Sequence, residues 1–304
     1  MKRINYYFKA LILLSIACSS CAKNGDNDET DGQTAKITMV ADAAASTIQI
    51  GFAGSGAASV DWGDGNRQNI ELLAIPEYYE HTYGKTQSAR NISIAANKLE
   101  FVDCNNNSLT ELDLSNNSGL KYLYCSSNLL TSLDLSRNLA LNHLECSNNR
   151  IASINTQSNI VLMTVYCNNN RLQSLNVSKN LALIDLNCDD NSIPSLNLAE
   201  NTALETLTCS RNLLTSLNLS KNTALNELEC DENSLTALDF TANTTLFYVH
   251  CFDNLLDVDA LNEMFGTLHD NFNGSRKKDV YIGGNSGANI CNRAIAVNKG
   301  WTVH

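Results

Sequence analysis

Eight cysteines at a constant spacing of 21 residues are the side chains of this 304-residue sequence with the clearest capacity for chemistry. In an exported protein such a set could form disulfides, and four converging thiols could bind zinc. Which of these is possible depends on the elements that position the thiols. The eight are Cys104, Cys125, Cys146, Cys167, Cys188, Cys209, Cys230 and Cys251.

Each cysteine lies in the same frame, L-x-x-L-x-C-x-x-N-x-L-x-x-L-x-L, of which residues 120–135 are the clearest copy. A fixed period of about 20 to 50 residues indicates a solenoid, in which every repeat forms one rung. Leu123 and Cys125 are two residues apart on an extended segment, so both point to one face. Stacked rungs then form a parallel sheet with a buried inner face. Because no helical pattern fits within 21 residues, we expect the return segments to be extended or 3₁₀.

This arrangement argues against cysteine chemistry. Neighbouring rungs lie about 4.8 Å apart, which suits the Cα atoms of a disulfide. Parallel side chains, however, keep their Cβ atoms about 4.8 Å apart instead of the usual distance of about 3.8 Å. A one-dimensional ladder also gives no point on which four zinc ligands converge. We therefore predict buried free thiols that pack as small hydrophobic groups; Cys291 has no evident partner.

Two asparagine ladders accompany the cysteines, one at each bend of the coil. Asparagine tolerates unusual backbone angles, and its amide can satisfy buried backbone groups along a stack, so we predict structural roles for both. The first ladder is Asn107, Asn128, Asn149, Asn170, Asn191, Asn212, Asn233 and Asn254. The second is Asn117, Asn138, Asn159, Asn180, Asn201, Asn222 and Asn243.

With cysteine at the position of the third leucine, the frame resembles the leucine-rich repeat, L-x-x-L-x-L-x-x-N-x-L. The 21-residue length is similar to that of the compact bacterial class found in internalins. The resemblance covers residues 96–256 as eight rungs. It implies a leucine-rich-repeat solenoid with a parallel β-sheet on the concave face and a mostly non-helical convex side.

The N-terminal residues resemble a bacterial lipoprotein signal peptide, which we assign to residues 1–20. Basic residues precede a short apolar run at 10–17, which is too short to span a bilayer. The run ends in small residues against Cys21, so Cys21 is the predicted lipidated residue. Cys18 is the alternative acylation site, and an ordinary secretory signal is a second interpretation.

Residues 21–35 form a polar, acidic stretch whose composition is typical of a flexible tether. The stretch resembles the segment after the lipid cysteine in surface lipoproteins of the Bacteroides type. That resemblance implies a protein that is anchored by lipid in the outer membrane and exposed at the cell surface.

Residues 36–95 alternate apolar and polar positions, as half-buried strands do, and glycines separate the runs. The pair of motifs Val60-Asp-Trp-Gly-Asp-Gly65 and His81-Thr-Tyr83 resembles the PKD-type β-sandwich. We therefore expect a small all-β domain that covers the first rung, since an uncovered rung would expose its core. Asp61 and Asp64 could bind calcium, but side-chain hydrogen bonds that tie a tight turn are the favoured interpretation.

Residues 257–304 break the repeat and are predicted to form an α/β C-terminal cap. Val258, Leu261, Met264, Phe265 and Leu268 have helical spacing, and Asp257 precedes them as a cap. A strand follows at 279–282, a second helix is expected over 288–298, and a last strand is expected at 301–303.

The outward positions of the strands are the candidate binding surface, because solenoids bind through their extended concave face. Two groups of aromatic residues stand out on it: Tyr122, Tyr124 and Tyr166 near the N-terminal end, and Phe247, Tyr248 and Phe252 near the other. Exposed aromatic residues are enriched at binding hot spots. The alternative interpretation is that these rings pack across strands or are covered by the caps, and it is favoured for the second group because the C-terminal cap lies nearby. The full candidate set is Tyr122, Tyr124, His143, Glu145, Tyr166, Asp185, Glu229, Tyr248 and His250.

Several functions are disfavoured. A formal charge of −11 repels nucleic-acid backbones, so no nucleic-acid partner is expected. His143 and His250 lie about five rungs, or roughly 24 Å, apart, so they cannot share a metal ion or relay a proton. No hydrolase or phosphate-binding motif occurs, and no catalytic residue, cofactor or metal is predicted.

The resemblance therefore favours a monomeric, non-enzymatic surface protein that binds a protein partner or mediates adhesion. A glycan-binding lipoprotein beside a nutrient-uptake system is the alternative, since aromatic platforms would suit it equally well. A structural spacer without a specific ligand is the third possibility.

Overall fold

The structure is a computed structural model that describes residues 35–84, 88–271 and 276–304. These residues belong to one compact unit, and the predicted signal peptide and lipidation site lie outside them. Among the described helices, none combines the length and the apolar character that a membrane span requires.

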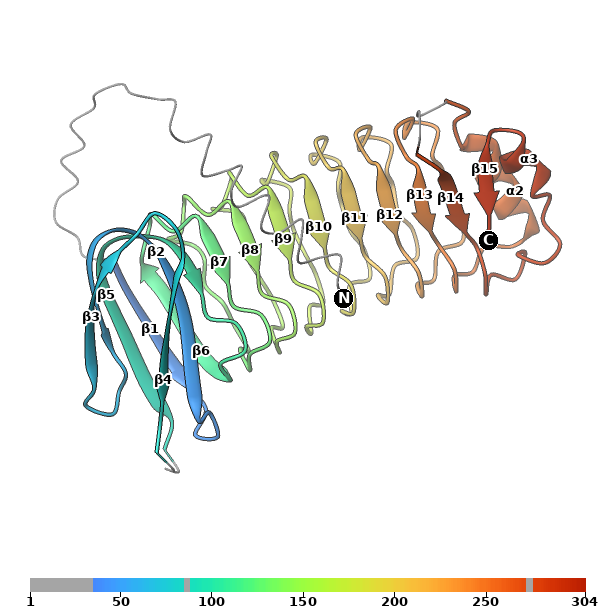
Figure 1. Ribbon diagram of the computed structural model, residues 1–304. Coiled ribbons are helices and arrows are strands. Elements are labelled where there is room, and N and C mark those ends of the chain that lie inside the picture. The colour runs from blue at the N-terminus through green and yellow to red at the C-terminus, as the bar shows by residue number, and fades with distance from the viewer. Residues whose placement is uncertain (1–34, 85–87, 272–275) are drawn as a thin grey trace, which may run out of the picture. The chain divides into compact units, whose positions relative to one another are not determined.

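A ladder of short parallel strands runs through the repeats (Figure 1). Leu123 pairs with Leu144, and Leu144 with Val165, so each central residue stacks on its equivalent 21 positions away. The central residues and the ladder cysteines are buried. Between β7 and β13 the return segments contain turns and extended chain but no helix, as predicted. The strands are β7 (Tyr122–Tyr124), β8 (His143–Glu145), β9 (Thr164–Tyr166), β10 (Asp185–Asn187), β11 (Thr206–Thr208), β12 (Glu227–Glu229) and β13 (Tyr248–His250).

The first asparagine ladder ties neighbouring rungs together. The amide of Asn212 donates to the carbonyls of Cys188, Cys209 and Ser210 at 3.0–3.2 Å, and its Oδ1 accepts from the backbone N–H of Ile193 at 3.0 Å. These bonds confirm the predicted structural role.

The asparagines themselves do not adopt the unusual backbone angles of the bend, and that part of the prediction is wrong. The residue before each asparagine has the positive φ, for example Arg211 at 51° before Asn212. The physical reason is that the asparagine side chain must turn inward to reach the backbone, so the exposed residue before it makes the left-handed turn. In the C-terminal cap, Asn285 takes the place of a ladder asparagine, and the residue before it is Gly284, which adopts such angles without strain.

The second ladder binds the other bend in a similar way. Asn159 Nδ2 donates to the carbonyls of Leu135 and Asn138, and Asn180 Nδ2 donates to those of Thr156 and Asn159. Each side chain therefore links its own rung to the rung before it.

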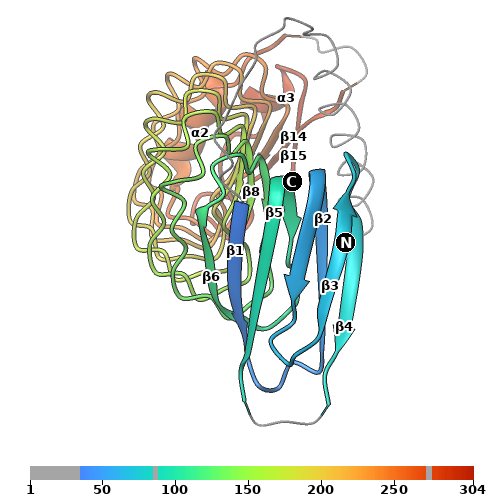
Figure 2. The same cartoon turned by 90° about the vertical axis from the view of Figure 1, so that its left-hand side faces the viewer.

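Six strands form the N-terminal β domain (Figure 2). β1 lies between β5 and β6 and is antiparallel to both, whereas β2 pairs with β3, β4 and β5. Gly54 is required where β2 crosses β5, because a Cβ atom there would lie 2.0 Å from the carbonyl oxygen of Lys98. The strands are β1 (Ala35–Ala41), β2 (Thr47–Asp61), β3 (Arg67–Leu72), β4 (Glu77–Thr82), β5 (Arg90–Asp103) and β6 (Leu109–Asn116).

The domain and the repeats share a strand. β5 begins antiparallel to β1 and ends parallel to β7, so the predicted boundary between residues 95 and 96 falls inside one continuous strand. β6, the return segment of the first rung, pairs with β1. The β domain therefore covers the first rung on both sides, which closes the end of its core.

The tight turn after β2 has the hydrogen bonds predicted for its two aspartates. Asp61 Oδ1 accepts from the N–H of Gly63 and Asp64 Oδ1 from that of Asn66, both at 3.0 Å. The second oxygen of Asp64 lies 2.7 Å from His81 Nε2, and this hydrogen bond is the largest cause of the lowering of the Asp64 pKa to about 2. The turn interpretation is therefore confirmed.

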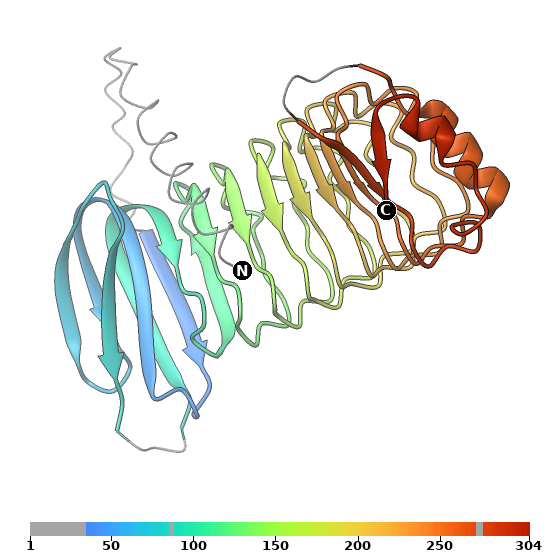
Figure 3. The ribbon, with the colours of Figure 1, turned by 45° about the vertical axis from the view of Figure 1, so that its right-hand side comes forward.

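The C-terminal cap continues the sheet with β14 (Lys278–Tyr281) and β15 (Trp301–Val303). The predicted first helix is α2 (Val258–Thr267), whose N-terminal Ala260 N–H donates to Asp257 at 2.8 Å. In Figure 3, α2 lies on the side of the coil away from the strands. It buries Leu261, Met264 and Phe265.

The predicted second helix is much shorter than expected, because only α3 (Ala294–Val297) is helical. The segment before it forms successive turns. Gly287 packs directly against the backbone of Asp257, where a Cβ atom would lie 2.4 Å from the carbonyl carbon. The N–H of Asn292 donates to Asn262 Oδ1 at 2.7 Å, outside any helical pattern. Contacts with the neighbouring segment therefore prevail over local helical preference.

Candidate functional site

The outward face of the parallel strands carries two rows of side chains. Because the central residue of each three-residue strand points into the core, the first and third residues point outward. The in-phase register of the pairs aligns these positions from rung to rung. All nine predicted surface residues belong to these rows: Tyr122, His143, Asp185 and Tyr248 to the first, and Tyr124, Glu145, Tyr166, Glu229 and His250 to the second.

The aromatic group near the N-terminal end is not the open patch predicted from the sequence. Tyr124 is 4% exposed and His143 is 6% exposed, while Tyr122 and Tyr166 are half-buried. The rings cover each other: the Tyr124 centroid lies 5.3 Å from that of Phe101 and 4.8 Å from that of His143. Burial lowers the pKa of His143 to about 4, so its imidazole is neutral at pH 7.

The middle of the face is acidic. Asp185 accepts a 2.5 Å hydrogen bond from the Tyr166 hydroxyl on the neighbouring strand. Burial raises the pKa values of Asp185, Glu227 and Glu229, and like charges nearby add to this effect at Asp185 and Glu227.

Two further carboxylates follow the cysteines of their rungs. Asp189 and Asp231 have pKa values raised to about 6 and about 7, mainly by burial, with repulsion from Glu229 adding to both. Asp231 still accepts hydrogen bonds from the N–H of Phe252 and the hydroxyl of Ser210. These carboxylates form an electronegative band beside the second row.

An aromatic cluster closes the C-terminal end of the face. The His250 ring lies 4.5 Å from that of Tyr248 and 4.1 Å from that of Tyr281, and Tyr281 stacks on His304 at 4.2 Å. His304 Nε2 lies 2.7 Å from Asp279 Oδ1. The structure thus unites the predicted Tyr248 and His250 with two rings that the sequence interpretation missed.

The signal for Tyr281 was present in the sequence. It lies four residues before Asn285, as His250 lies four residues before Asn254, and the two pair in register. For His304 there was no comparable signal, because the leucine and cysteine frame of the repeats is not kept around β15. Its position follows from the pairing of β15 with β14.

The rung geometry has counterparts among solved structures. The functional domain of InlJ from Listeria monocytogenes, described as including a cysteine ladder, matches with a TM-score of 0.57 and 30% identity, over 67% of this chain and 45% of that one. A leucine-rich-repeat protein of Leptospira interrogans matches with a TM-score of 0.53 and 19% identity, over 62% of this chain and 50% of that one.

The fold is an internalin-like leucine-rich-repeat solenoid. This chain spans about half the length of each of these two structures. No family model matches the sequence, and no similar sequence was found among curated proteins.

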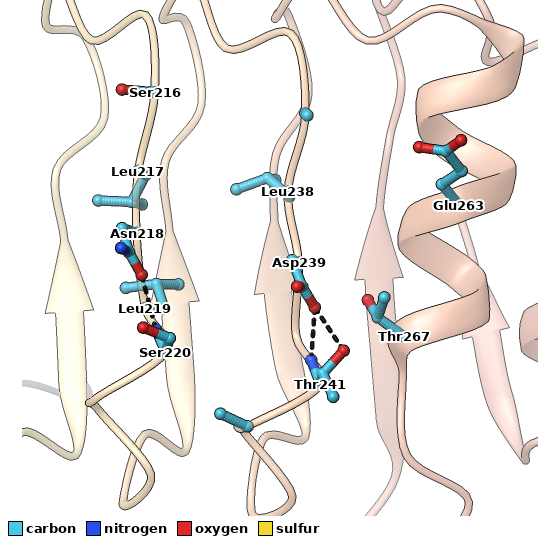
Figure 4. Close-up of a pocket in the computed structure, with 12 residues that line it drawn as sticks. Ser216, Leu217, Asn218, Leu219, Ser220, Leu238, Asp239, Thr241, Glu263 and Thr267 are labelled. Carbon is cyan, nitrogen blue, oxygen red and sulfur yellow. Dashed lines mark hydrogen bonds between the residues drawn. The ribbon is translucent and has the colours of Figure 1, made fainter.

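The leucine-rich-repeat solenoid also has a groove of about 760 Å³ on its return side (Figure 4). The return segments of two rungs and α2 line it, and its carboxylates are Asp239 and Glu263. Asp239 Oδ1 accepts hydrogen bonds from both the backbone N–H and the hydroxyl of Thr241. The lining contains no histidine or cysteine.

The described residues of the solenoid offer neither a group of metal ligands nor an exposed ladder thiol. Within the described ranges, no three His, Cys, Asp or Glu side chains are grouped closely enough to hold a metal ion. The eight ladder cysteines are free and buried, and Cys230 Sγ lies 3.3 Å from the carbonyl of His250 on the next rung. Burial raises the pKa of Cys146 to about 12, so the thiolate is not populated near neutral pH.

Alkylation should reveal this protection. At pH 8 we expect iodoacetamide to label the eight ladder cysteines at least about a hundredfold more slowly in the folded protein than in 6 M guanidinium. The half-buried Cys291 should react first among the described cysteines and serves as the internal control. Mass spectrometry of tryptic peptides measures each site. Rapid labelling of Cys146 or Cys188 without unfolding would contradict a packed ladder.

Proposed function

We propose that this solenoid is a non-enzymatic binding protein whose outward strand face holds a protein partner. One observation carries the proposal: the buried frame repeats almost unchanged, while the two outward rows differ from rung to rung along one continuous surface. Constant positions meet the needs of packing, whereas variable outward ones give a surface its specificity. The likeness to InlJ and other leucine-rich-repeat structures supports a binding scaffold.

The chemistry of the face suggests where binding energy is concentrated. The half-buried rings of Tyr248, His250 and Tyr281 are held against each other, so little side-chain entropy is lost when they bind. Glu227 and Glu229 lie on the next strand, which places negative charge beside the rings. Aromatic anchors with a charged rim are typical of protein-binding hot spots.

A paired set of surface variants tests the proposal. We expect Tyr122→Ser, Tyr166→Ser and Tyr248→Ser together to abolish binding to any extracellular protein that the wild type recognises on a protein array. The control variant changes two exposed return-side residues, Glu200→Gln and Lys221→Gln, and should bind as the wild type does. Circular dichroism confirms that both variants are folded. Binding that survives the tyrosine changes but not the control changes would refute the strand face.

Glycan binding is the second candidate, and the stacked rings of Tyr281 and His304 favour it, because sugars pack against flat aromatic faces. A glycan array probed with the same proteins separates the two. A glycan signal of the wild type that is lost in a further variant, Tyr281→Ser, would favour glycan capture. A solenoid that recognises neither proteins nor glycans would favour a structural spacer.

We further propose that Cys21 carries a lipid that anchors the solenoid in the outer membrane and exposes it at the cell surface. The sequence of residues 1–35 supports this proposal, and Cys18 is the alternative site. In cells fed radiolabelled palmitate, we expect the wild type to be labelled and Cys21→Ala to lose the label. Cys18→Ala is the matched control and should stay labelled. Continued labelling of Cys21→Ala would reject the assignment.

A further inference from the structure

A ridge of exposed aliphatic side chains begins at the second bend and extends toward the first outward row. Leu139, Ile160 and Leu181 are 57%, 60% and 58% exposed, and Val161 and Met163 beside them are 42% and 38% exposed. Single exposed hydrophobic residues are ordinary, but contiguous ones mark interaction sites. We refer to these five residues as the aliphatic ridge.

The ridge is contiguous because the bends stack directly. Each of its first three residues follows an asparagine of the second ladder. Asn159 Nδ2 donates to the Asn138 carbonyl at 2.9 Å, and Asn180 Nδ2 donates to the Asn159 carbonyl at 2.8 Å. The three aliphatic tips are therefore one rung apart, about 10 Å from first to last.

The ridge is confined to three rungs. The equivalent positions elsewhere are polar and exposed: Ser118, Thr202, Thr223 and Thr244. The frame thus accepts threonine at this bend without any change of fold. Packing does not require the aliphatic residues here, and a contiguous exposed set of them is typical of a surface that contacts another molecule.

We propose that the aliphatic ridge binds an amphipathic helix of a partner protein, whose apolar stripe is edged by acidic residues. A helix rises about 10.5 Å between positions i and i+7, which matches the length of the ridge. Its i, i+4 and i+7 side chains would sit between the aliphatic tips. The exposed Arg137 and Lys179 lie two residues before Leu139 and Leu181, and they would meet the acidic edge.

Other occupants fit less well. An added β-strand needs free backbone groups, but the bend carbonyls of Asn138 and Asn159 already accept hydrogen bonds from the next rung and from the turn. An anionic bilayer would extend past Arg137 and Lys179 to Glu200 and Glu205 on the rung just past the ridge, whereas a single helix as short as the ridge would not.

A second copy of the chain also fits poorly. A twofold axis across the ridge would bring Arg137 of one copy near Lys179 of the other. This arrangement brings like charges together.

The test uses the full chain and a designed probe. The probe is a fluorescein-labelled helical peptide with leucines at i, i+4, i+7 and i+11 and glutamates along one edge of that stripe. A control peptide has lysines in place of the glutamates. We expect saturable binding of the glutamate peptide by fluorescence anisotropy and at least about tenfold weaker binding of the lysine peptide.

Variants locate the site. Leu139→Thr, Ile160→Thr and Leu181→Thr together copy the threonines of the later rungs and should weaken binding at least about tenfold. Leu213→Ser, which removes a leucine that is 57% exposed on the other bend, is the matched control and should bind normally. Arg137→Ser with Lys179→Ser should reduce the preference for the glutamate peptide.

Four results would overturn the proposal. They are failure of the glutamate peptide to bind, equal binding by the triple-threonine variant, binding of phosphatidylglycerol vesicles that depends on the ridge, and a dimer in sedimentation that the threonine changes abolish. The vesicle result would assign the ridge to a lipid surface, and the dimer result to a second copy. Unchanged circular dichroism of the variants excludes unfolding as the cause.

Discussion

Replacing Asn212 with alanine is expected to lower the free energy of unfolding by about 3 kcal/mol. Asn212 is buried, and one side chain makes four hydrogen bonds to the backbone of two rungs. Alanine leaves the N–H of Ile193 without this partner, and the carbonyls of Cys188 and Cys209 each lose one of two asparagine donors. A buried backbone group without a partner costs about 1–3 kcal/mol.

Urea denaturation followed by circular dichroism measures this loss. The matched control is Asn218→Ala, which removes an exposed asparagine whose Oδ1 accepts from the Ser220 N–H and should cost less than about 1 kcal/mol. Because each rung contacts only its neighbours, hydrogen exchange in the Asn212 variant should quicken most around β10 to β12. Equal stability of the two variants would contradict the role of the ladder.

The second large effect expected is a stabilising contribution from Asp189 and Asp231 on acidification from pH 8 to pH 5, on the order of 2 kcal/mol. Asp231 is 3% exposed, and burial raises its pKa to about 7; Asp189 follows with a pKa of about 6. The ordinary value of 3.8 applies to both once the chain unfolds. Between these values the two carboxyl groups bind more protons in the folded state than in the unfolded state, so their contribution to stability falls as pH rises from about 4 to about 7. The buried His143, whose pKa is lowered to about 4, acts in the opposite direction, so the carboxyl contribution must be isolated by substitution.

Asp231→Asn isolates the contribution of one carboxyl group. Its amide oxygen can still accept from the Phe252 N–H, while its charge no longer opposes folding at pH 8. Acidification from pH 8 to pH 5 should therefore raise the urea midpoint less, or lower it more, in this variant than in the wild type. Glu200→Gln, at an exposed return-side position, should leave the difference unchanged. The same pH dependence in Asp231→Asn as in the wild type would refute this account.

The candidate binding face was only partly predictable. The spacing of Tyr124 and Cys125 showed correctly that one side chain lies outside the core and the other inside it. It could not show that Phe101 and His143 would cover the tyrosine ring, because ring contacts depend on rotamers as well as register. Similarly, the sequence predicted Tyr248 and His250 as surface residues but did not place His304 beside Tyr281.

Two features depend on contacts between elements that are not adjacent in sequence. The predicted domain boundary fell inside β5, because the pairing of residues 101–103 with β7 extends a strand that begins in the β domain. The predicted helix over residues 288–298 shortened to α3, because Gly287 packs against the backbone of Asp257. Neither contact can be predicted from the local helix or strand propensity of the residues involved.

The sequence by itself determined the solenoid, its parallel sheet, its buried thiols and its structural asparagines. A strict 21-residue period allows one arrangement in which every leucine and cysteine is buried against the equivalent residue of the next rung. The contacts between rungs can therefore be predicted from the repeat alone. Only the tertiary structure decided which outward side chains remain accessible, which carboxylates resist ionisation and where the aliphatic ridge lies. These properties depend on the non-repeating residues, whose exposure and charge are set by their neighbours on adjacent rungs.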